Sequence, residues 1–191
     1  YHESAVTNER HQTRTQAPGK LLDLAGLAAI LAPRGFSAKE VLSTYQKMYE
    51  AQVVSYPRTE DKTVTPEQFN ELLPKIDQIA QVVHVDTALL THRQPRATHV
   101  KNQGAHGANR PGENVPTDLA TLTKFGASAQ AIYEVLAKNY LAMLAEDYVY
   151  DHVTANLTDY PIFKTAYNVP VQLNFKAVYD SQRSIKVDDD D

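Results

Sequence analysis

The chain has no cysteine and no tryptophan, and only seven of its 191 residues are glycine. Without cysteine, neither a disulfide framework nor a thiolate metal site is possible, and the composition fits a reducing compartment. No run approaches the roughly 20 apolar residues of a transmembrane helix, and the first residues lack the basic and apolar regions of a signal peptide. With 42% hydrophobic residues and no low-complexity tract, the sequence predicts a folded, soluble protein.

An excess of positive charge is also missing. The net charge of −4 argues against an independent nucleic-acid-binding protein, which is usually basic, although the four aspartates at 188–191 account for the whole deficit. One stretch is locally basic. It contains Arg93, Arg96, Lys101, Arg110 and Lys124 against Glu113 and Asp118, with His92, His99 and His106 between them. This pattern is equally typical of a phosphate-attracting surface and of a solvated loop.

The eight residues VVSYPRTE, at 53–60, combine a strand end, a turn and reactive side chains. Pro57 cannot continue a ladder or a helix, so Tyr56 is expected where the strand stops. After the turn, Arg58 can reach the same side as the phenol. Together they offer a nucleophile and a fork of phosphate-binding donors, as attack on a phosphodiester requires. Taken alone, however, a tyrosine at a strand end is more often structural.

A second segment, the heptapeptide AHGANRP at 105–111, favours a catalytic role for this tyrosine. SYPRT, after a helix ending in YE, resembles the active-site segment of type IA DNA topoisomerases, especially the topoisomerase III branch. AHGANRP is similar to the AH-x-A-x-RP motif of the same domain in that family. The resemblance covers roughly residues 16–150. It is specific, because two unrelated motifs match in order and in spacing.

The resemblance implies a role for each matching residue. Tyr56 takes the place of the DNA-cleaving nucleophile, Arg58 that of the arginine holding the scissile phosphate, and His106 that of a histidine contacting DNA. Further DNA-binding positions implied by the family are Ser55, Thr59, Arg110 and, on the helix before the tyrosine, Gln46 and Glu50. The chain also departs from the family pattern. Glu60 stands where aspartate is usual, and Asn109 stands where many members have an apolar residue.

The implied reaction is an ATP-independent transesterification on single-stranded DNA. The phenol bonds to the 5′ phosphate, the 3′ hydroxyl leaves, another strand passes through the gap, and the step reverses. The family binds Mg²⁺ in a separate toprim domain, and nothing here matches its acidic cluster: the aspartates at 188–191 are expected to be a solvated tail, and the histidines lack the paired spacing of a zinc site.

We therefore expect a fragment of a bacterial, cytoplasmic enzyme. Its partners would be single-stranded DNA and the remaining domains of the full-length topoisomerase, with no membrane association. No cofactor is expected in this chain, and Mg²⁺ is expected to be bound by the missing toprim domain. The fragment by itself would be inactive for that reason.

Hydrophobic spacing predicts a helical domain that carries the two motifs. Ser37 with Glu40, and Thr65 with Gln68, have the spacing of capping boxes at helix starts. The non-periodic stretch 84–116, rich in His, Gly, Asn and Pro, is expected to be mostly loop that displays AHGANRP. The expected helices are 19–31, 37–50, 65–83 and 128–145.

From Tyr148 the pattern alternates as in half-buried strands, over 149–160 and 169–187, with turn signals at Asp159–Pro161 and Asp180–Gln182. The expected fold class is α+β. By resemblance, a mainly helical, winged-helix-like domain carrying the tyrosine is inserted into a β-rich arch domain that is present only in part. The expected division is 1–15 for the start of the arch, 16–147 for the tyrosine domain and 148–191 for the return strands.

Other functional classes stay open at this point. A non-catalytic single-stranded DNA-binding winged-helix module would bind DNA equally well after Tyr56→Phe and would never form a covalent adduct. A tyrosine recombinase would place several catalytic basic residues before a tyrosine near the domain end, whereas here the tyrosine comes first. A purely structural interaction protein would leave both motif matches as coincidence.

Overall fold

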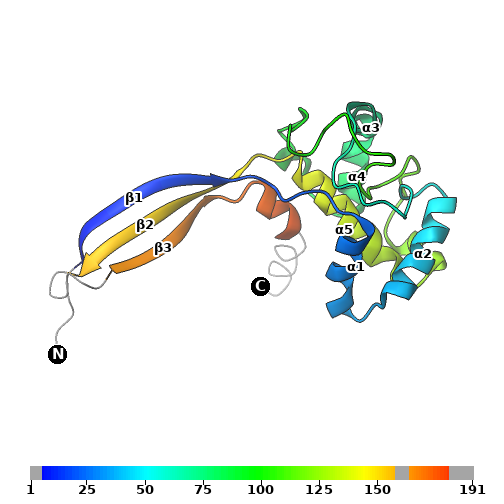
Figure 1. The fold of residues 1–191 in the computed structure, drawn as a ribbon, viewed down its shortest axis with the longest axis horizontal. Coiled ribbons are helices and arrows are strands. Elements are labelled where there is room, and N and C mark those ends of the chain that lie inside the picture. The colour runs from blue at the N-terminus through cyan, green and yellow to red at the C-terminus, as the bar shows by residue number, and fades with distance from the viewer. Residues whose placement is uncertain (1–5, 158–163, 181–191) are drawn as a thin grey trace.

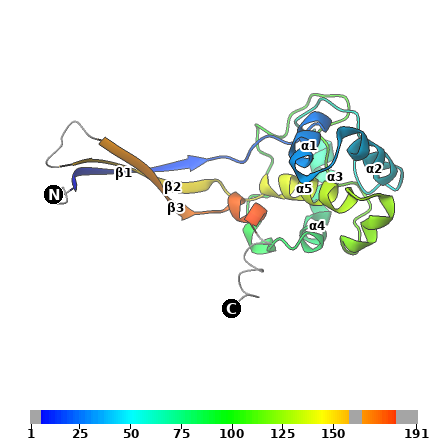
Figure 2. The ribbon, with the colours of Figure 1, turned by 90° about the horizontal axis from the view of Figure 1, so that it is seen from below.

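A computed structural model describes residues 6–157 and 164–180, and its α+β architecture confirms the expected fold class. A three-stranded antiparallel sheet extends to one side of a lobe built from helices and loops (Figures 1 and 2). The turn expected at Asp159–Pro161, residues 181–182 of the second expected turn, residues 181–187 of the second expected strand segment, and the aspartates at 188–191 lie outside the described residues.

The sheet joins segments from both ends of the described chain. Its order is β1-β2-β3, with β1 at Val6–Gln16, β2 at Tyr148–Leu157 and β3 at Lys164–Gln172. Gln16 pairs with Tyr148 at one end of the antiparallel β1–β2 ladder, so the chain leaves the sheet there, builds the lobe and returns. The sequence of 1–15 is only weakly patterned. β1 forms there because β2 offers it a row of backbone hydrogen-bonding partners.

The expectation of strand throughout 169–187 is wrong in part. β3 ends at Gln172, and residues 175–180 form a helix. Asn174, between the two, has a left-handed φ of 51° and donates its side-chain amide to the carbonyl of Asp147 at 2.7 Å. Phe175 and Val178 are both buried. Their three-residue spacing places them on one face of a helix, so burial against the lobe selects helix over strand.

The first two helices begin at side-chain caps. α1 (Leu24–Leu31) starts later than expected because Asp23 caps it, accepting a hydrogen bond from the backbone N–H of Gly26 at 2.7 Å. α2 (Ala38–Glu50) starts at Ser37 as predicted, with the serine hydroxyl accepting from the N–H of Glu40 at 3.2 Å. The Glu40 carboxylate instead accepts from Thr44, so the expected capping box is only half formed.

The helix expected over 65–83 is broken into α3 (Pro66–Leu72) and α4 (Ile76–Val82) by a 3-10 turn at Leu73–Lys75. Proline 74 lies in this turn, and proline interrupts a helix because it has no N–H and its ring crowds the preceding turn. The start of α3 carries the predicted capping box, formed in both directions between Thr65 and Gln68.

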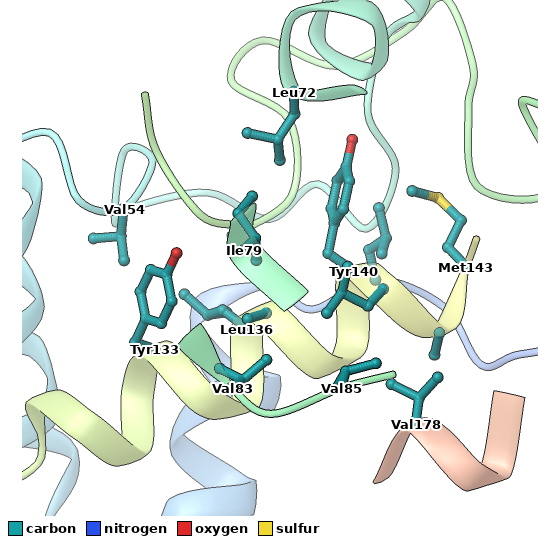
Figure 3. Packing of buried hydrophobic residues seen from close by; sticks show 14 of the residues in the cluster. Val54, Leu72, Ile79, Val83, Val85, Tyr133, Leu136, Tyr140, Met143 and Val178 are labelled. Carbon is teal, nitrogen blue, oxygen red and sulfur yellow. The ribbon is translucent and has the colours of Figure 1, made fainter. Parts of the chain in front are cut away.

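The last helix of the lobe, α5 (Ala129–Ala142), lies at the centre of the core. It packs against α1, α2 and α4, and most of its residues are buried. Figure 3 shows Leu136 and Tyr140 among the core side chains that surround Ile79 of α4. Val178 of the 175–180 helix reaches the same cluster. The core therefore supports both the tyrosine-bearing segment and the start of the sheet.

This packing predicts a large stability effect at Leu136, which is fully buried. Leu136→Ala should lower the free energy of unfolding by about 2–5 kcal/mol, because it removes apolar contacts and leaves a cavity. Ile30→Ala, on α1 and 45% exposed, is the control and should change it by less than about 1 kcal/mol. Urea denaturation followed by circular dichroism measures both. Equal effects would show that α5 is not the centre of the core.

Candidate active site

The two sequence motifs lie side by side because the backbone joins them. The chain reverses after α2 through Gln52, whose φ of 61° is left-handed. Val54 then forms an isolated antiparallel bridge with Pro111, and the N–H of Ser55 donates to the carbonyl of Arg110 at 3.0 Å. The strand expected before Tyr56 is thus reduced to a single bridge, and these pairs hold residues 54–55 against the last residues of AHGANRP.

The Tyr56 side chain is half-buried between two other rings. It stacks on the imidazole of His106, with ring centroids 4.4 Å apart and planes inclined by 30°. The ring of Tyr49, near the end of α2, meets it edge-on, with centroids 5.6 Å apart. The phenol is thus restrained by rings from two different segments, which limits the positions that its hydroxyl can take.

Asp61 holds the backbone of the histidine motif. Its Oδ2 atom accepts hydrogen bonds from the N–H groups of His106 and Gly107, at 3.0 and 2.8 Å. Gly107 has a φ of +76°, and a Cβ atom there would lie 2.4 Å from Oε1 of Gln68, so a side chain cannot be accommodated without a shift. The adjacent Glu60, which aligns with the usual aspartate of the family, is exposed. The carboxylate that contacts AHGANRP is therefore that of Asp61, one residue after the position at which the family usually has aspartate.

These contacts lower the pKa of the Asp61 carboxyl, chiefly through the hydrogen bond from the His106 N–H. A lowered folded-state pKa means that the contribution to stability is present above the unfolded-state pKa, near 4, and is lost as pH falls through the folded value. The amide NMR signals of His106 and Gly107 should therefore shift together on acidification below about pH 4.

Asp61→Asn should abolish that shared titration, because the amide has no carboxyl proton to gain. Glu60→Gln, at the exposed neighbouring position, is the matched control and should leave it in place. If the Gly107 amide titrates unchanged in Asp61→Asn, Asp61 does not control this loop.

Among the remaining residues expected at the site, Ser55 and Thr59 bond to the backbone of the loops, whereas Arg58 makes no such contact with the described residues. The Ser55 hydroxyl accepts from the N–H of Arg110 at 3.0 Å, and the buried Thr59 hydroxyl accepts from the N–H of Asp61 at 3.0 Å. Arg58 is exposed and, within the described part of the chain, has no hydrogen bond or ion pair. Its guanidinium is therefore available to an external anion.

Gln46 and Glu50 lie on α2, four residues apart and exposed. The Gln46 amide donates to the Glu50 carboxylate at 3.5 Å. Across residues 6–157 and 164–180, neither has a hydrogen bond to Tyr56 or Arg58. The structure places them on the helix that leads to the tyrosine without joining them to it.

Arg110 acts inside the motif. Its guanidinium donates to the carbonyls of Ala108 and His106, at 2.8 and 3.3 Å. Burial lowers the pKa of Arg110, opposed by the nearby Tyr140, Tyr45 and Glu71 side chains. Its main structural role is thus to shape the loop that carries the histidine.

A pocket of about 370 Å³ opens beside Arg110, lined by Tyr49, Gln52, Val54, Ser55, Gln68, Glu71, Leu72, Lys75, Arg110, Pro111, Gly112 and Glu113.

Much of the basic stretch is used to hold the lobe together. Arg93 pairs with Asp77 at 2.5 Å. Arg96 pairs with Asp147 at 2.8 Å and also donates to two backbone carbonyls at the end of α5. His99 is buried, with Nε2 at 2.8 Å from the carbonyl of Gly19, and burial lowers its pKa. The sequence left two interpretations of this stretch open, a phosphate-attracting surface and a solvated loop. Neither describes these three residues, because their side chains make contacts within the lobe.

Among the described residues, no group of three or more His, Asp or Glu side chains is placed to hold a metal ion. Also within that part, no helix is long and apolar enough to cross a membrane.

Comparison with known proteins identifies the family. Residues 2–190 match the family model described as DNA topoisomerase, so the chain belongs to the DNA topoisomerases. Its similarity to several DNA topoisomerase 3 proteins supports a fragment of a type IA topoisomerase, as the two motifs predict.

DNA topoisomerase 3 of Bacillus licheniformis is 31% identical over an alignment 180 residues long, which covers 86% of this chain and 23% of that protein. DNA topoisomerase 1 of Rickettsia conorii is 30% identical over an alignment 132 residues long, which covers 64% of this chain and 16% of that protein. Full-length topoisomerase I from Thermotoga maritima shares the fold, with a TM-score of 0.61 at 18% identity, over 92% of this chain and 29% of that one. The chain thus spans 16–29% of the length of these three proteins.

Three contributors to the site were not singled out from the sequence: Tyr49, Asp61 and Tyr45. Tyr49, on α2, is 36% exposed and meets the Tyr56 ring, and Tyr45, on the same helix, bonds to Asn109 of the second motif. Asp61 follows the motif but is not part of it. For Asn109 the sequence did give a signal, because the residue departs from the family pattern. Its partners, however, could be found only from the fold.

Proposed function

We propose that this chain is the nucleophile-bearing part of a bacterial type IA topoisomerase, which cleaves and rejoins single-stranded DNA in the cytoplasm and so changes DNA topology. The observation that carries the proposal is the stacking of the Tyr56 phenol on the His106 imidazole, 4.4 Å between centroids, where the two motifs meet. A second support is Arg58, two residues away, whose exposed guanidinium has no partner among the described residues.

In the proposed reaction, the Tyr56 hydroxyl oxygen attacks the phosphorus of a phosphodiester. A bond from that oxygen to phosphorus forms, the bond from phosphorus to the 3′ oxygen breaks, and the phenolic proton is transferred overall to the departing 3′ oxygen. Arg58 would bind the phosphate oxygens as charge builds on them, and His106 would donate a hydrogen bond to the same phosphate. Religation is the same step in reverse, so no ATP is required.

The domain division follows the same proposal. Residues 16–147 would be the winged-helix-like tyrosine domain, and 1–15 with 148–191 would be the two ends of a β-rich arch. The antiparallel pairing of β1 with β2, which brings these two ends together, supports it. We assign the Mg²⁺ site of the complete enzyme to a toprim domain, as the resemblance implies; residues 6–157 and 164–180 contain no group of three or more His, Asp or Glu side chains placed to hold a metal ion. The isolated chain is then expected not to relax DNA.

The pocket of about 370 Å³ gives the DNA strand a place beside the nucleophile. Tyr49 lines it and also contacts the Tyr56 ring, so the pocket begins where the reacting phosphate would lie. Among the side chains that line it, the exposed Gln52 amide would bond to base edges, and Lys75, which also donates to the Glu113 carbonyl, would bond to phosphate.

The decisive experiment supplies the toprim portion of a related topoisomerase with Mg²⁺, this chain and end-labelled single-stranded DNA, and stops the reaction with denaturant. The expected result is a covalent adduct that survives denaturation, maps by mass spectrometry to the peptide containing Tyr56, and carries a 5′ phosphate link with a free 3′ hydroxyl on the other fragment. Binding of DNA with no adduct under any condition would favour the non-catalytic DNA-binding module instead.

A further inference from the structure

One side chain from AHGANRP reaches the backbone on which the tyrosine is mounted. Asn109 is 1% exposed, and its side-chain nitrogen lies 2.7 Å from the Tyr45 hydroxyl and 3.2 Å from the Pro57 carbonyl oxygen. The same nitrogen is 3.5 Å from the carbonyl oxygen of Tyr56 itself. One of its two hydrogens can thus bond to the Tyr45 hydroxyl, and the other to the carbonyls of Tyr56 and Pro57.

Tyr45 extends this contact to the other side of the nucleophile. Because its hydroxyl accepts from Asn109, its own proton is available to the Ser55 hydroxyl, 3.4 Å away. Burial raises the pKa of Tyr45 to about 12, so that proton is kept at neutral pH. Ser55 in turn accepts from the N–H of Arg110 at 3.0 Å. The residues before and after Tyr56 are therefore tied to the same loop and to α2.

We propose that Asn109 is a positioning residue for the nucleophile: by donating to the Pro57 and Tyr56 carbonyls and to Tyr45, it fixes the backbone that sets the Tyr56 ring against His106. This inference rests on the proposed role of Tyr56. An apolar residue at this position would leave the Tyr45 hydroxyl with one partner fewer and the Pro57 carbonyl without this donor, inside a buried region where unsatisfied polar groups are costly.

The structure offers a variant that keeps the shape and removes the donor. Asn109→Asp retains the side-chain volume but presents oxygen, in place of an N–H donor, to the two carbonyls. Asn139→Asp is the matched control. Asn139 is also buried, at 8% exposure, and its amide also donates to a backbone carbonyl, that of Lys20 at 3.3 Å, on α5. Both variants therefore lose a buried amide donor, but only one of them faces the tyrosine.

The first measurement is made on this chain by NMR. Ring protons of Tyr56 and His106 should show nuclear Overhauser contacts in the unmodified protein, since their centroids are 4.4 Å apart. Asn109→Asp should weaken or abolish these contacts while Asn139→Asp keeps them. If Asn109→Asp does not fold, Tyr45→Phe takes its place, because it removes the hydroxyl that joins Asn109 to Ser55, and it should shift the Ser55 and Tyr56 backbone signals.

The second measurement is single-turnover adduct formation with the toprim portion and Mg²⁺, together with single-stranded DNA affinity. Asn109→Asp should form the adduct about tenfold to a hundredfold more slowly, with affinity changed by less than about twofold, because misplacement of a reacting group affects the rate far more than binding. Asn139→Asp should keep both values near those of the unmodified chain.

The inference is overturned if Asn109→Asp keeps the ring contacts and an adduct rate equal to that of Asn139→Asp. It is also overturned if rate and affinity fall by the same factor, because that is the result of a purely structural loss. Failure of the proposed function looks different. In that case no variant and no unmodified chain forms an adduct at Tyr56, whatever happens to the ring contacts.

Discussion

Replacing Tyr56 with phenylalanine should abolish covalent adduct formation, by at least about 10⁴-fold, in the reconstituted reaction with the toprim portion, Mg²⁺ and single-stranded DNA. The physical reason is that the phenolic oxygen is the atom that bonds to phosphorus, and the variant has no atom to replace it. The ring contacts with His106 and Tyr49 involve carbon faces and edges, so the variant should fold normally. Its thermal midpoint should lie within a few degrees of the unmodified chain.

The control for this prediction is Tyr49→Phe. Tyr49 is the neighbouring phenol, 5.6 Å between ring centroids from Tyr56, and it is partly exposed to solvent as well. Its variant loses the same atom from the same region and should form the adduct at a nearly normal rate. If the adduct persists in Tyr56→Phe and disappears in Tyr49→Phe, the nucleophile is Tyr49 and the assignment of Tyr56 is wrong.

Arg58→Ala should reduce adduct formation by about a hundredfold to a thousandfold, the usual loss when a charged donor to a transition state is removed. Its effect on stability should be within about 0.5 kcal/mol, because the exposed guanidinium makes no hydrogen bond or ion pair with the described residues. Single-turnover rates and urea denaturation, measured on the same preparation, separate the two effects.

Arg58→Lys should recover only part of the rate, since an ammonium group keeps the charge but not the planar fork that binds two phosphate oxygens. Arg34→Ala, at an exposed arginine in the turn after α1, removes the same charge and serves as the control for a general loss of DNA attraction. If Arg34→Ala and Arg58→Ala slow the reaction equally, Arg58 contributes only net charge and does not contact the scissile phosphate.

Local signals in the sequence were sufficient for many elements. Ser37 caps α2, Thr65 and Gln68 form a capping box, and the two motifs identify the family, because each of these depends on residues a few positions apart. The two errors have different causes. The break within 65–83 had a local signal in Pro74, which the continuous apolar pattern outweighed in the prediction. The 175–180 helix forms because Phe175 and Val178 are buried against the lobe, which the sequence does not show.

The sequence by itself determined the family, the candidate nucleophile and the helix that leads to it, since these are written in contiguous residues. Only the tertiary structure decided the surroundings of Tyr56. The contacts of Asn109 with Tyr45 and Pro57, and of Asp61 with His106, join residues 45 to 64 positions apart. Such pairs have no shared periodicity or spacing in the chain. They exist because bridges such as Val54 to Pro111 bring the two motifs together in the folded protein.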